Sequence, residues 1–312
     1  DSTEVEPRTA INATNTPGDA DSLFKITLPG SYYLTGNITG VAGKKGIEFA
    51  SDNVTLDLNG FTLLGVAGSL SGVGTDVGHN NVTVRNGTVT GWGDDGVVLA
   101  TGSTSLAQIV ENVAVRSAGS VGIRVRNGVV RGCTVSACPS GAILGLDTST
   151  VESCHTIGGI VGISTGNGSV IRSCIVEQST TDGIAAGSDG VIIQCTARAN
   201  GAFGMGVGAG GRVTDCVARD NTTGGIFADT GSVVEGCSAT SNNTEGISVF
   251  AGCLVLDCAA EGNGLSGIKV TSNCGVRGNV CKGNGTLGVG AGILATGADN
   301  RIETNNCTTS DR

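Results

Sequence analysis

The chain has 312 residues, of which 54 are glycine and only 4 are proline, and its net charge is −9. Glycine without abundant proline and without a triplet period excludes collagen, and 39% hydrophobic residues beside 14% charged residues excludes a disordered chain. The acidic balance argues against a nucleic-acid partner, and no apolar run approaches the ~18 residues that a membrane-spanning helix needs.

The first part of the chain is the least regular. Residues 1–30 carry no repeat, and we expect them to cap the edge of the first repeat, because an unpaired strand edge needs shielding. Residues 31–312 are expected to form one domain, with longer and irregular repeats up to about residue 120 and looped-out corners at residues 64–79 and 91–107. The chain begins at Asp1 with neither an initiator methionine nor an apolar signal segment, which indicates a processed or trimmed chain.

From about residue 121 the sequence repeats with a period of 21 residues, once shortened to 20. Several residue types follow this period independently, including pairs of glycine and isoleucine such as Gly225-Ile226 and Gly246-Ile247. The cysteines of the period are Cys133, Cys154, Cys174, Cys195, Cys216, Cys237 and Cys258. The asparagines are Asn200, Asn221, Asn242, Asn263 and Asn284. A fixed period of this length indicates a solenoid of stacked structural repeats.

Each repeat predicts three short strands and three turns. Apolar residues alternate with polar ones over stretches of a few residues, turn residues separate these stretches, and no helical periodicity occurs. The predicted fold is therefore all-β: a parallel β-helix, or β-solenoid, with coils of about 21 residues stacked at ~4.8 Å. The last coil, which begins near Asn300, is expected to be incomplete, so that the edge toward Arg312 stays open.

Stacking predicts where the recurrent residues point. Inward positions take small apolar side chains, whereas glycine and asparagine are expected at the corners, where the backbone adopts positive φ. Asparagines on successive coils can hydrogen-bond along their column, which favours a structural role for the asparagine ladder.

The twelve cysteines are interpreted mainly as buried apolar thiols. Cβ atoms on successive coils lie ~4.8 Å apart, whereas a disulfide prefers ~3.8 Å. Cys253 and Cys274 form a shorter second column, and Cys133 and Cys138 are candidates for pairing across a turn. No zinc site is expected, since the sequence has no C-x-x-C and only two histidines, His79 and His155; the latter is expected to point outward into solvent.

The strongest catalytic candidates are Asp94 and Asp95. Paired carboxylates can share acid and base roles in glycoside hydrolysis, Trp92 beside them could stack on a sugar ring, and Arg124 could supply a cation. The alternative without a catalytic role is an ordinary Asp-Asp-Gly turn, in which adjacent carboxylates point to opposite faces. No cofactor or metal is expected, and calcium stays an open alternative.

The segment that begins at Leu28 and runs through Tyr32 and Tyr33, followed by the stretch from Asp52 to Phe61, resembles the opening of bacterial exported proteins of the pectin-lyase-like superfamily. The 21-residue repeats extend this resemblance from about residue 25 to the end of the chain. It implies a right-handed parallel β-helix that is secreted or lies at a bacterial cell surface. The superfamily includes lyases, hydrolases, adhesins and phage spikes; of the four polygalacturonase-like motifs, only Asp94-Asp95 has a match here.

Three functional hypotheses follow. The preferred one is a non-catalytic extracellular structural or adhesive solenoid, whose open end invites head-to-tail self-association into filaments. The first alternative is a polysaccharide lyase or hydrolase that acts on an acidic polysaccharide near Asp94, Asp95 and Arg124. The second is a glycan-binding module. Its candidate stacking residues are Trp92, Tyr32, Tyr33 and Phe227.

Overall fold

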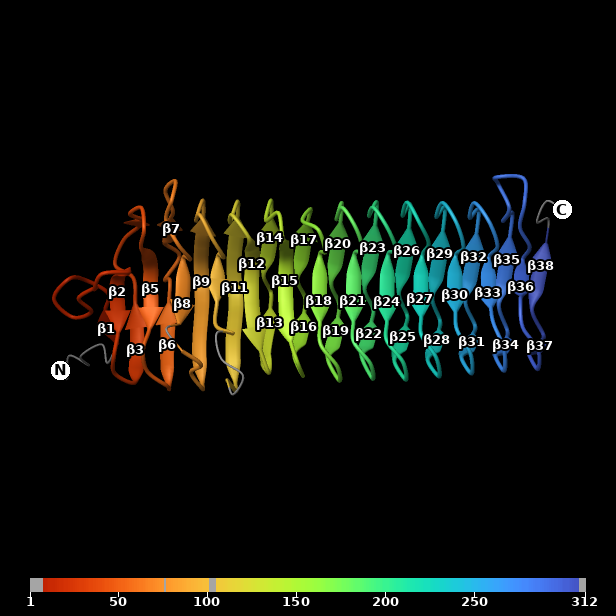
Figure 1. Ribbon diagram of the computed structural model, residues 1–312, viewed down its shortest axis with the longest axis horizontal. Coiled ribbons are helices and arrows are strands. Elements are labelled where there is room, and N and C mark those ends of the chain that lie inside the picture. Colours follow the sequence, from red (N-terminus) through yellow and green to blue (C-terminus); the bar gives the residue numbers. More distant parts are fainter. Residues whose placement is uncertain (1–7, 76, 101–104, 309–312) are drawn as a thin grey trace, which may run out of the picture. The chain divides into compact units, whose positions relative to one another are not determined.

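The computed structural model describes residues 8–75, 77–100 and 105–308, and these residues form strands and turns without a helix (Figure 1). No segment of the described residues is therefore a helix that could cross a membrane. The chain divides into two compact units, Asp1–Leu146 and Asp147–Arg312, called unit 1 and unit 2 below. The predictions that concern Asp1 and Arg312 themselves lie outside the described residues.

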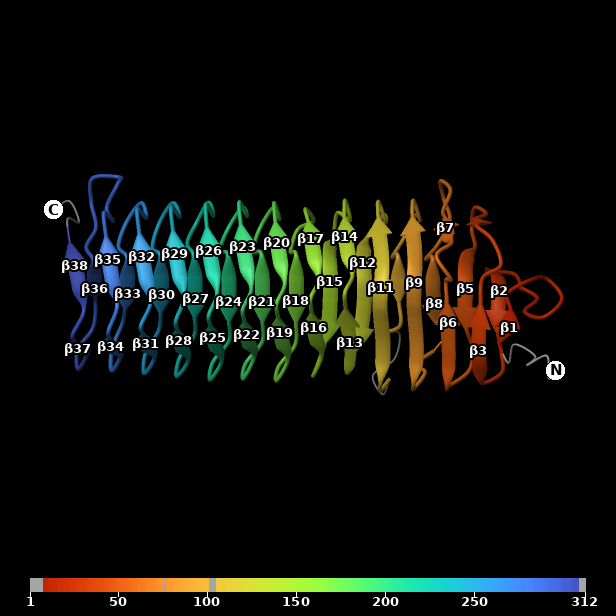
Figure 2. The same ribbon diagram turned by 180° about the vertical axis from the view of Figure 1, so that it is seen from behind.

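Unit 2 is the regular part, and its successive strands are seen from the front and from behind in Figures 1 and 2. Each coil contributes three short strands, which we call a, b and c, and strands of the same kind on successive coils pair in parallel. The a strands are β16 (Thr150–Glu152), β19 (Val170–Arg172), β22 (Val191–Ile193), β25 (Arg212–Thr214), β28 (Val233–Glu235), β31 (Leu254–Leu256), β34 (Gly275–Arg277) and β37 (Arg301–Glu303). The b strands are β17 (His155–Ile157), β20 (Ile175–Glu177), β23 (Thr196–Arg198), β26 (Val217–Arg219), β29 (Ser238–Thr240), β32 (Ala259–Glu261), β35 (Val280–Lys282) and β38 (Asn306–Thr308). The c strands are β18 (Ile163–Thr165), β21 (Ile184–Ala186), β24 (Met205–Val207), β27 (Ile226–Ala228), β30 (Ile247–Val249), β33 (Ile268–Val270) and β36 (Ile293–Ala295).

The register of these strands confirms the predicted stacking of identical positions. On the a strands Ile171 is opposite Ile192, and Ile192 is opposite Val213. On the c strands Ile226 is opposite Ile247. These side chains are fully buried. On the a strands the residues on both sides of them point outward, and on the c strands the following residue does, as the alternation of a pleated strand requires. The sequence period is thus the coil length, and the apolar columns form the core.

Unit 1 has the same parallel pairing but less uniform coils. Strands of its larger sheet are β1 (Thr9–Ala10), β3 (Gly30–Tyr33), β4 (Ile38–Thr39), β6 (Val54–Asp57), β7 (Thr62–Leu64), β9 (Val82–Thr90), β11 (Gln108–Arg116), β13 (Gly128–Arg131) and β14 (Thr134–Ser136). Strands of its second sheet are β2 (Ser22–Ile26), β5 (Lys45–Phe49), β8 (Val73–Thr75), β10 (Val97–Val98), β12 (Val121–Arg126) and β15 (Gly141–Leu146). The nine-residue strands β9 and β11 pair over two stretches, of the kind that unit 2 divides between separate a and b strands.

One expectation for unit 1 needs correction. Residues 64–79 and 91–107 are not simply looped-out corners, because they contain β8 and β10, which continue the second sheet. The described part of the N-terminal segment, from residue 8, also joins the sheets: β1 pairs with β3 and β2 with β5, and Ile11 and Ile26 are buried. This segment covers the following coil by adding strands to it.

The asparagine ladder of unit 2 is confirmed as a closed hydrogen-bonded column. The Nδ2 of Asn200 donates to Oδ1 of Asn221 at 3.0 Å, and the same bond joins Asn221 to Asn242 at 2.9 Å, Asn242 to Asn263 at 3.0 Å and Asn263 to Asn284 at 2.8 Å. All five side chains are buried. Each amide therefore satisfies its neighbour in a place that water does not reach.

These asparagines do not occupy the positive-φ corners that the sequence suggested for them. The residues before them do: Ala199, Asp220 and Ser241 have φ between 54° and 57°. The residue before each cysteine of the period also has a positive φ, for example 54° at Asp215 and 63° at Gly236. A left-handed residue turns the chain, and the next side chain can then point inward. In unit 1, by contrast, Asn53 and Asn81 themselves take positive φ.

The twelve cysteines all lie in the described part of the chain and form no disulfide, and all except Cys307 are buried. Pairing of Cys133 with Cys138 is wrong, because neither forms a disulfide, and the extended strand β14 separates the two residues. Their Sγ atoms instead donate to the carbonyls of Arg131 and Ser136. Burial raises the pKa of the Cys138 and Cys253 thiols, as expected for apolar cysteines in a core.

Candidate functional site

Asp94 and Asp95 diverge. Asp95 is 4% exposed, and its two oxygens accept hydrogen bonds from Nε of Arg124 at 2.8 Å, from Nη2 of Arg124 at 3.3 Å and from the amide of Val121 at 2.9 Å. Asp94 is exposed, and one of its oxygens lies 3.4 Å from Oγ of Ser71. The structure thus brings Asp95 and Arg124 together as a two-pronged ion pair and places the Asp94 carboxylate elsewhere.

Trp92, the suggested sugar-stacking residue, lies in the core of unit 1. It is 1% exposed, and its Nε1 donates to the carbonyl of Leu63 at 3.1 Å. Its ring occupies space that three glycines leave open: a Cβ at Gly40, Gly46 or Gly72 would lie within 3.0 Å of the indole. A buried indole with its donor satisfied is a packing residue, so this position does not fit a glycan platform.

The two tyrosines also have structural partners. Tyr32 is buried, burial raises its pKa, and its hydroxyl donates to the carbonyl of Leu28 at 2.9 Å. Tyr33 is half-buried, and the guanidinium of Arg8 lies 4.7 Å from the centre of its ring. One face of Tyr33 is therefore covered by a cation–π contact.

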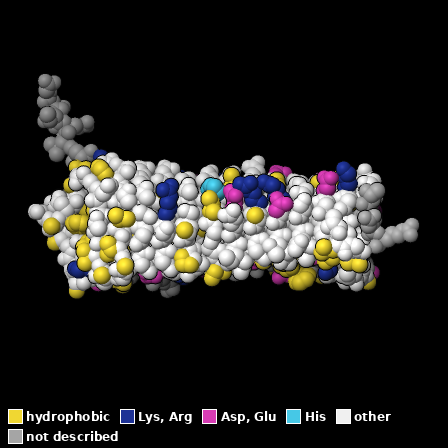
Figure 3. Space-filling model, turned by 90° about the horizontal axis from the view of Figure 1, so that it is seen from above, with side chains coloured by type: hydrophobic (Ala, Val, Ile, Leu, Met, Phe, Trp, Pro, Cys, Tyr) yellow, Lys and Arg dark blue, Asp and Glu magenta, His cyan; other side chains and the backbone are white. Residues whose placement is uncertain are grey.

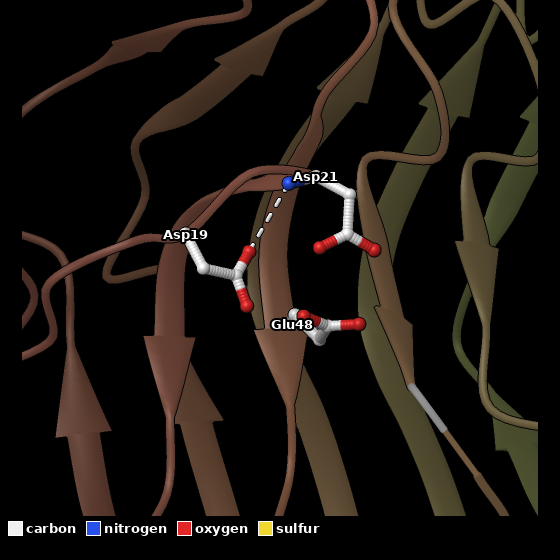
Figure 4. Close-up of side chains that lie close together, drawn as sticks. All are labelled: Asp19, Asp21 and Glu48. Atoms are coloured by element: carbon white, nitrogen blue, oxygen red, sulfur yellow. Dashed lines mark hydrogen bonds between the residues drawn. The ribbon is translucent and has the colours of Figure 1, made fainter.

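A group of acidic side chains in unit 1 has the composition of a cation site. Asp19 and Asp21, which precede β2, and Glu48 of β5 turn their carboxylates toward one another (Figure 4). Two lysines already compensate most of the negative charge of the group: Nζ of Lys25 lies 2.8 Å from Oδ2 of Asp19 and 3.1 Å from Oε2 of Glu48, and Lys45 also pairs with Glu48. Lys25 and Ser22 hold the pKa of Asp19 well below its usual range. The group is an ion-pair cluster that joins the first coils.

The outward charges of unit 2 pair across coils. Glu177 is bound on both sides, by Nη2 of Arg198 at 2.7 Å and by Nε2 of His155 at 3.0 Å, so His155 points outward but is held by a partner. Arg198 and His155 lower the pKa of Glu177. Arg212 pairs with Glu235 at 3.0 Å in the same way, and oppositely charged side chains lie next to one another on the face seen in Figure 3. Such cross-strand pairs align neighbouring coils.

Phe227 is the one suggested binding residue that belongs to a larger outward-facing group. Its ring centre lies 5.6 Å from that of Phe203 and 5.3 Å from that of Phe250, and the three residues come from successive coils. Phe203 precedes β24, Phe227 is the outward residue of β27, and Phe250 follows β30. The three rings, called the aromatic strip below, therefore cross the c strands diagonally. Phe250 is 46% exposed, and the other two rings are partly exposed.

Small residues keep the strip open. Gly206 and Ser248 are the register neighbours of Phe227 on the preceding and following coils, so the positions directly in register with its ring carry only small residues. Gly224 leaves room for Phe203, because a Cβ there would lie 2.5 Å from Cε1 of that ring. An exposed set of aromatic rings can cover the apolar face of a sugar or another flat apolar group.

Sequence reasoning found Phe227 but missed Phe203 and Phe250. The three phenylalanines are 24 and 23 residues apart, not 21, so they occupy three different positions of the repeat and form no ladder. Their proximity depends on the diagonal offset between neighbouring coils. The available signal was the scarcity of aromatic residues, which make up 3% of the chain, together with spacings close to one coil.

Comparisons with known proteins bear on the fold. No curated protein matches the sequence. Among solved structures, the chain is similar to the periplasmic alginate epimerase AlgG, with a TM-score of 0.58 and 13% identity over 94% of this chain and 81% of the epimerase. It is also similar to the N-terminal fragment of gene product 12 of bacteriophage Phi29, with a TM-score of 0.58 and 11% identity over 88% of this chain and 66% of that fragment. A family model described as a right-handed β-helix region matches residues 71–231 and 158–309, and by this coverage the chain belongs to the right-handed β-helix family.

Proposed function

We propose that this protein is a glycan-binding β-solenoid, and that it binds its ligand at the aromatic strip of Phe203, Phe227 and Phe250. The chain has nine aromatic residues in all, namely six Phe, two Tyr and one Trp. Three of them meet on the outer face of the c strands. This gathering of scarce, partly exposed aromatic rings carries the proposal, because isolated exposed apolar residues are ordinary whereas a contiguous group marks a binding surface.

The residues beside the strip suit a polar, hydroxyl-bearing ligand. Ser248 is the register neighbour of Phe227, and Lys269 is the register neighbour of Ser248. Nζ of Lys269 lies 3.1 Å from Oε1 of Glu245, so a hydroxyl, an ammonium donor and a carboxylate acceptor lie near the strip. Aromatic rings with flanking donors and acceptors are the combination that orients a ligand with apolar faces and polar edges. A polysaccharide outside the cytoplasm is the proposed ligand, supported by the shared fold with a protein named as a periplasmic alginate epimerase.

Removal of the strip tests this proposal. We expect Phe227→Ala and Phe250→Ala each to weaken binding to a polysaccharide that the wild-type protein retains, by about ten-fold, since an aromatic contact contributes roughly 0.5–1.5 kcal/mol beyond its buried area. The measurement is isothermal titration with hits from a panel of neutral and acidic polysaccharides. Phe61→Ala is the matched control, because Phe61 is also partly exposed but lies in unit 1.

Unchanged affinity of Phe227→Ala and Phe250→Ala would contradict glycan binding at the strip. The same mixtures should be assayed for new reducing ends and for unsaturated products. Product formation that disappears in Asp95→Asn would favour the lyase or hydrolase hypothesis over simple binding.

End-to-end association is the second candidate function, and exposed core positions at the last described coil favour it. Ile302 is 44% exposed, whereas Val276, its register neighbour on the preceding coil, is fully buried. Cys307 is exposed, whereas its register neighbour Cys281 is buried. Within residues 105–308, β37 and β38 pair on one side only, with β34 and β35. Apolar columns and unpaired strand edges of this kind are the surface that a second copy would cover.

We expect the native protein to form end-to-end assemblies as its concentration rises, and Ile302→Lys to prevent them. Light scattering after size-exclusion chromatography, in reducing buffer so that Cys307 cannot cross-link, measures the mass. A monomeric wild-type protein at all concentrations, or assemblies that persist in Ile302→Lys, would contradict this function.

A further inference from the structure

A hollow on the a strands of unit 2 lies apart from the aromatic strip. It has a volume of about 260 Å³ and is lined by side chains of β31, β34 and β37. The lining residues that matter below are Leu254, Leu256, Gly275, Arg277, Arg301 and Glu303. Its volume is slightly below the usual range of ligand sites, about 300–1,000 Å³, and suits one small polar molecule or one unit of a polymer.

The hollow exists because one outward position lacks a side chain. The first outward position of the a strands carries threonine, valine, arginine or leucine on every described coil of unit 2 except one, where Gly275 takes that place. Gly275 stands in register between Leu254 and Arg301, so the gap has an apolar wall on one side and a guanidinium on the other. The side chain of Leu254 leans toward the gap, since a Cβ at Gly275 would lie 2.7 Å from Cδ2 of Leu254.

The charges around the hollow favour an anion. The second outward column places Arg277 between Leu256 and Glu303. Nε of Arg301 pairs with Oε1 of Glu303 at 2.6 Å. Within the described part of the chain Arg277 forms no ion pair, although most other outward arginines of unit 2 do. Two guanidinium groups and one carboxylate leave the hollow with one uncompensated positive charge, which Arg277 carries. The planar guanidinium of an arginine offers parallel N–H donors that suit a carboxylate.

We propose that this hollow binds a sugar acid, either free or as a uronate unit of a polysaccharide. Arg277 would receive the carboxylate, Leu254 and Leu256 would contact the apolar face of the ring, and Glu303 with Arg301 would bond the hydroxyls. This inference does not rest on glycan binding at the aromatic strip, because the hollow lies on the a strands and the strip on the c strands. The two sites can therefore be tested separately.

Two substitutions act on the hollow by different means. Gly275→Val fills it, and valine suits the strand, because Val170, Val191 and Val233 occupy the same position on other coils and the φ of Gly275 is not positive. The only near contact of a new Cβ is the end of the flexible Leu254 side chain. Arg277→Gln keeps the size of the side chain but removes its charge. The matched control is Arg212→Gln, since Arg212 stands in the same column as Gly275 and is paired with Glu235.

The experiment is a ligand-observed NMR titration with sodium glucuronate, with glucose as the neutral probe and a short oligouronate as the polymer probe. We expect wild type, Arg212→Gln and Phe227→Ala to bind glucuronate alike, and Gly275→Val and Arg277→Gln to lose at least ten-fold in affinity, with melting temperatures near that of wild type. Tighter binding of the oligouronate would assign the site to a polymer unit, and equal binding would assign it to the free acid. The proposal would be overturned if glucose bound as tightly as glucuronate or if glucuronate did not bind. It would also be overturned if Gly275→Val and Arg277→Gln bound glucuronate with the affinity of wild type. If Phe227→Ala left the affinity for polysaccharide unchanged, that result would count against the aromatic strip alone.

Discussion

Replacement of Asn242 by alanine is expected to lower the free energy of unfolding of its coils by about 3–5 kcal/mol. The Oδ1 of Asn242 accepts from the amide of Asn221 at 3.1 Å and from its Nδ2 at 2.9 Å, while Nδ2 of Asn242 donates to the carbonyl of Ala218 at 3.1 Å and to Asn263. The site is fully buried, so the released partners find no water. Each buried polar group left unsatisfied costs about 1–3 kcal/mol, and the substitution leaves more than one.

The matched control is Asn243→Ala, because Asn243 is the next residue and is exposed. We expect this control to change stability by less than about 0.5 kcal/mol. Since stacked repeats can unfold locally, amide hydrogen exchange of the coils around Asn242 should accompany urea unfolding. Equal effects of the two substitutions would show that the asparagine column does not hold the coils together.

Trp92→Ala is expected to destabilise unit 1 by about 3–5 kcal/mol, the range for deleting a large buried aromatic side chain. The indole fills space bordered by Gly40, Gly46 and Gly72, and these glycines have no side chains that could move into the cavity. Trp92→Phe should cost less, because it keeps most of the buried area but leaves the carbonyl of Leu63 without the indole donor. Thermal or urea unfolding followed by near-ultraviolet circular dichroism measures both variants.

The same variants separate the packing role of Trp92 from a role in glycan stacking. A core tryptophan predicts loss of stability, with glycan affinity unchanged in the fraction that stays folded. If Trp92→Ala were as stable as wild type and lost glycan affinity, the packing role of Trp92, inferred from its 1% exposure, would be contradicted.

The regular coils could be predicted because each residue there repeats its neighbour's environment. Asn221, for example, contacts an asparagine on the preceding coil and another on the following coil. The sequence period alone therefore predicts which side chains meet, and the hydrogen bonds of the asparagine column follow from it. The burial of the cysteines and the three strands per coil follow for the same reason. Pairing of Cys133 with Cys138 failed because it was judged by sequence distance and ignored the extended strand between them.

The candidate sites could be predicted only in part, since they depend on departures from the period. Asp95 meets Arg124 across an offset of 29 residues, in a region where coil length varies. Phe203, Phe227 and Phe250 meet because side chains reach diagonally to the next coil, and the hollow arises from a single missing side chain at Gly275. Such features follow from three-dimensional offsets of a few ångströms, which a ladder of identical residues does not encode.

A crystal structure of the protein with a bound oligosaccharide that it retains in solution would test the central claim most directly, namely that in-register stacking builds a glycan-binding surface from Phe203, Phe227 and Phe250. We expect sugar density over the ring of Phe227. In the same coils, one hydrogen-bonded column is expected to consist of Asn200, Asn221, Asn242, Asn263 and Asn284. Phenylalanines on separate faces, or an occupied sugar site elsewhere with bare rings at the aromatic strip, would contradict it.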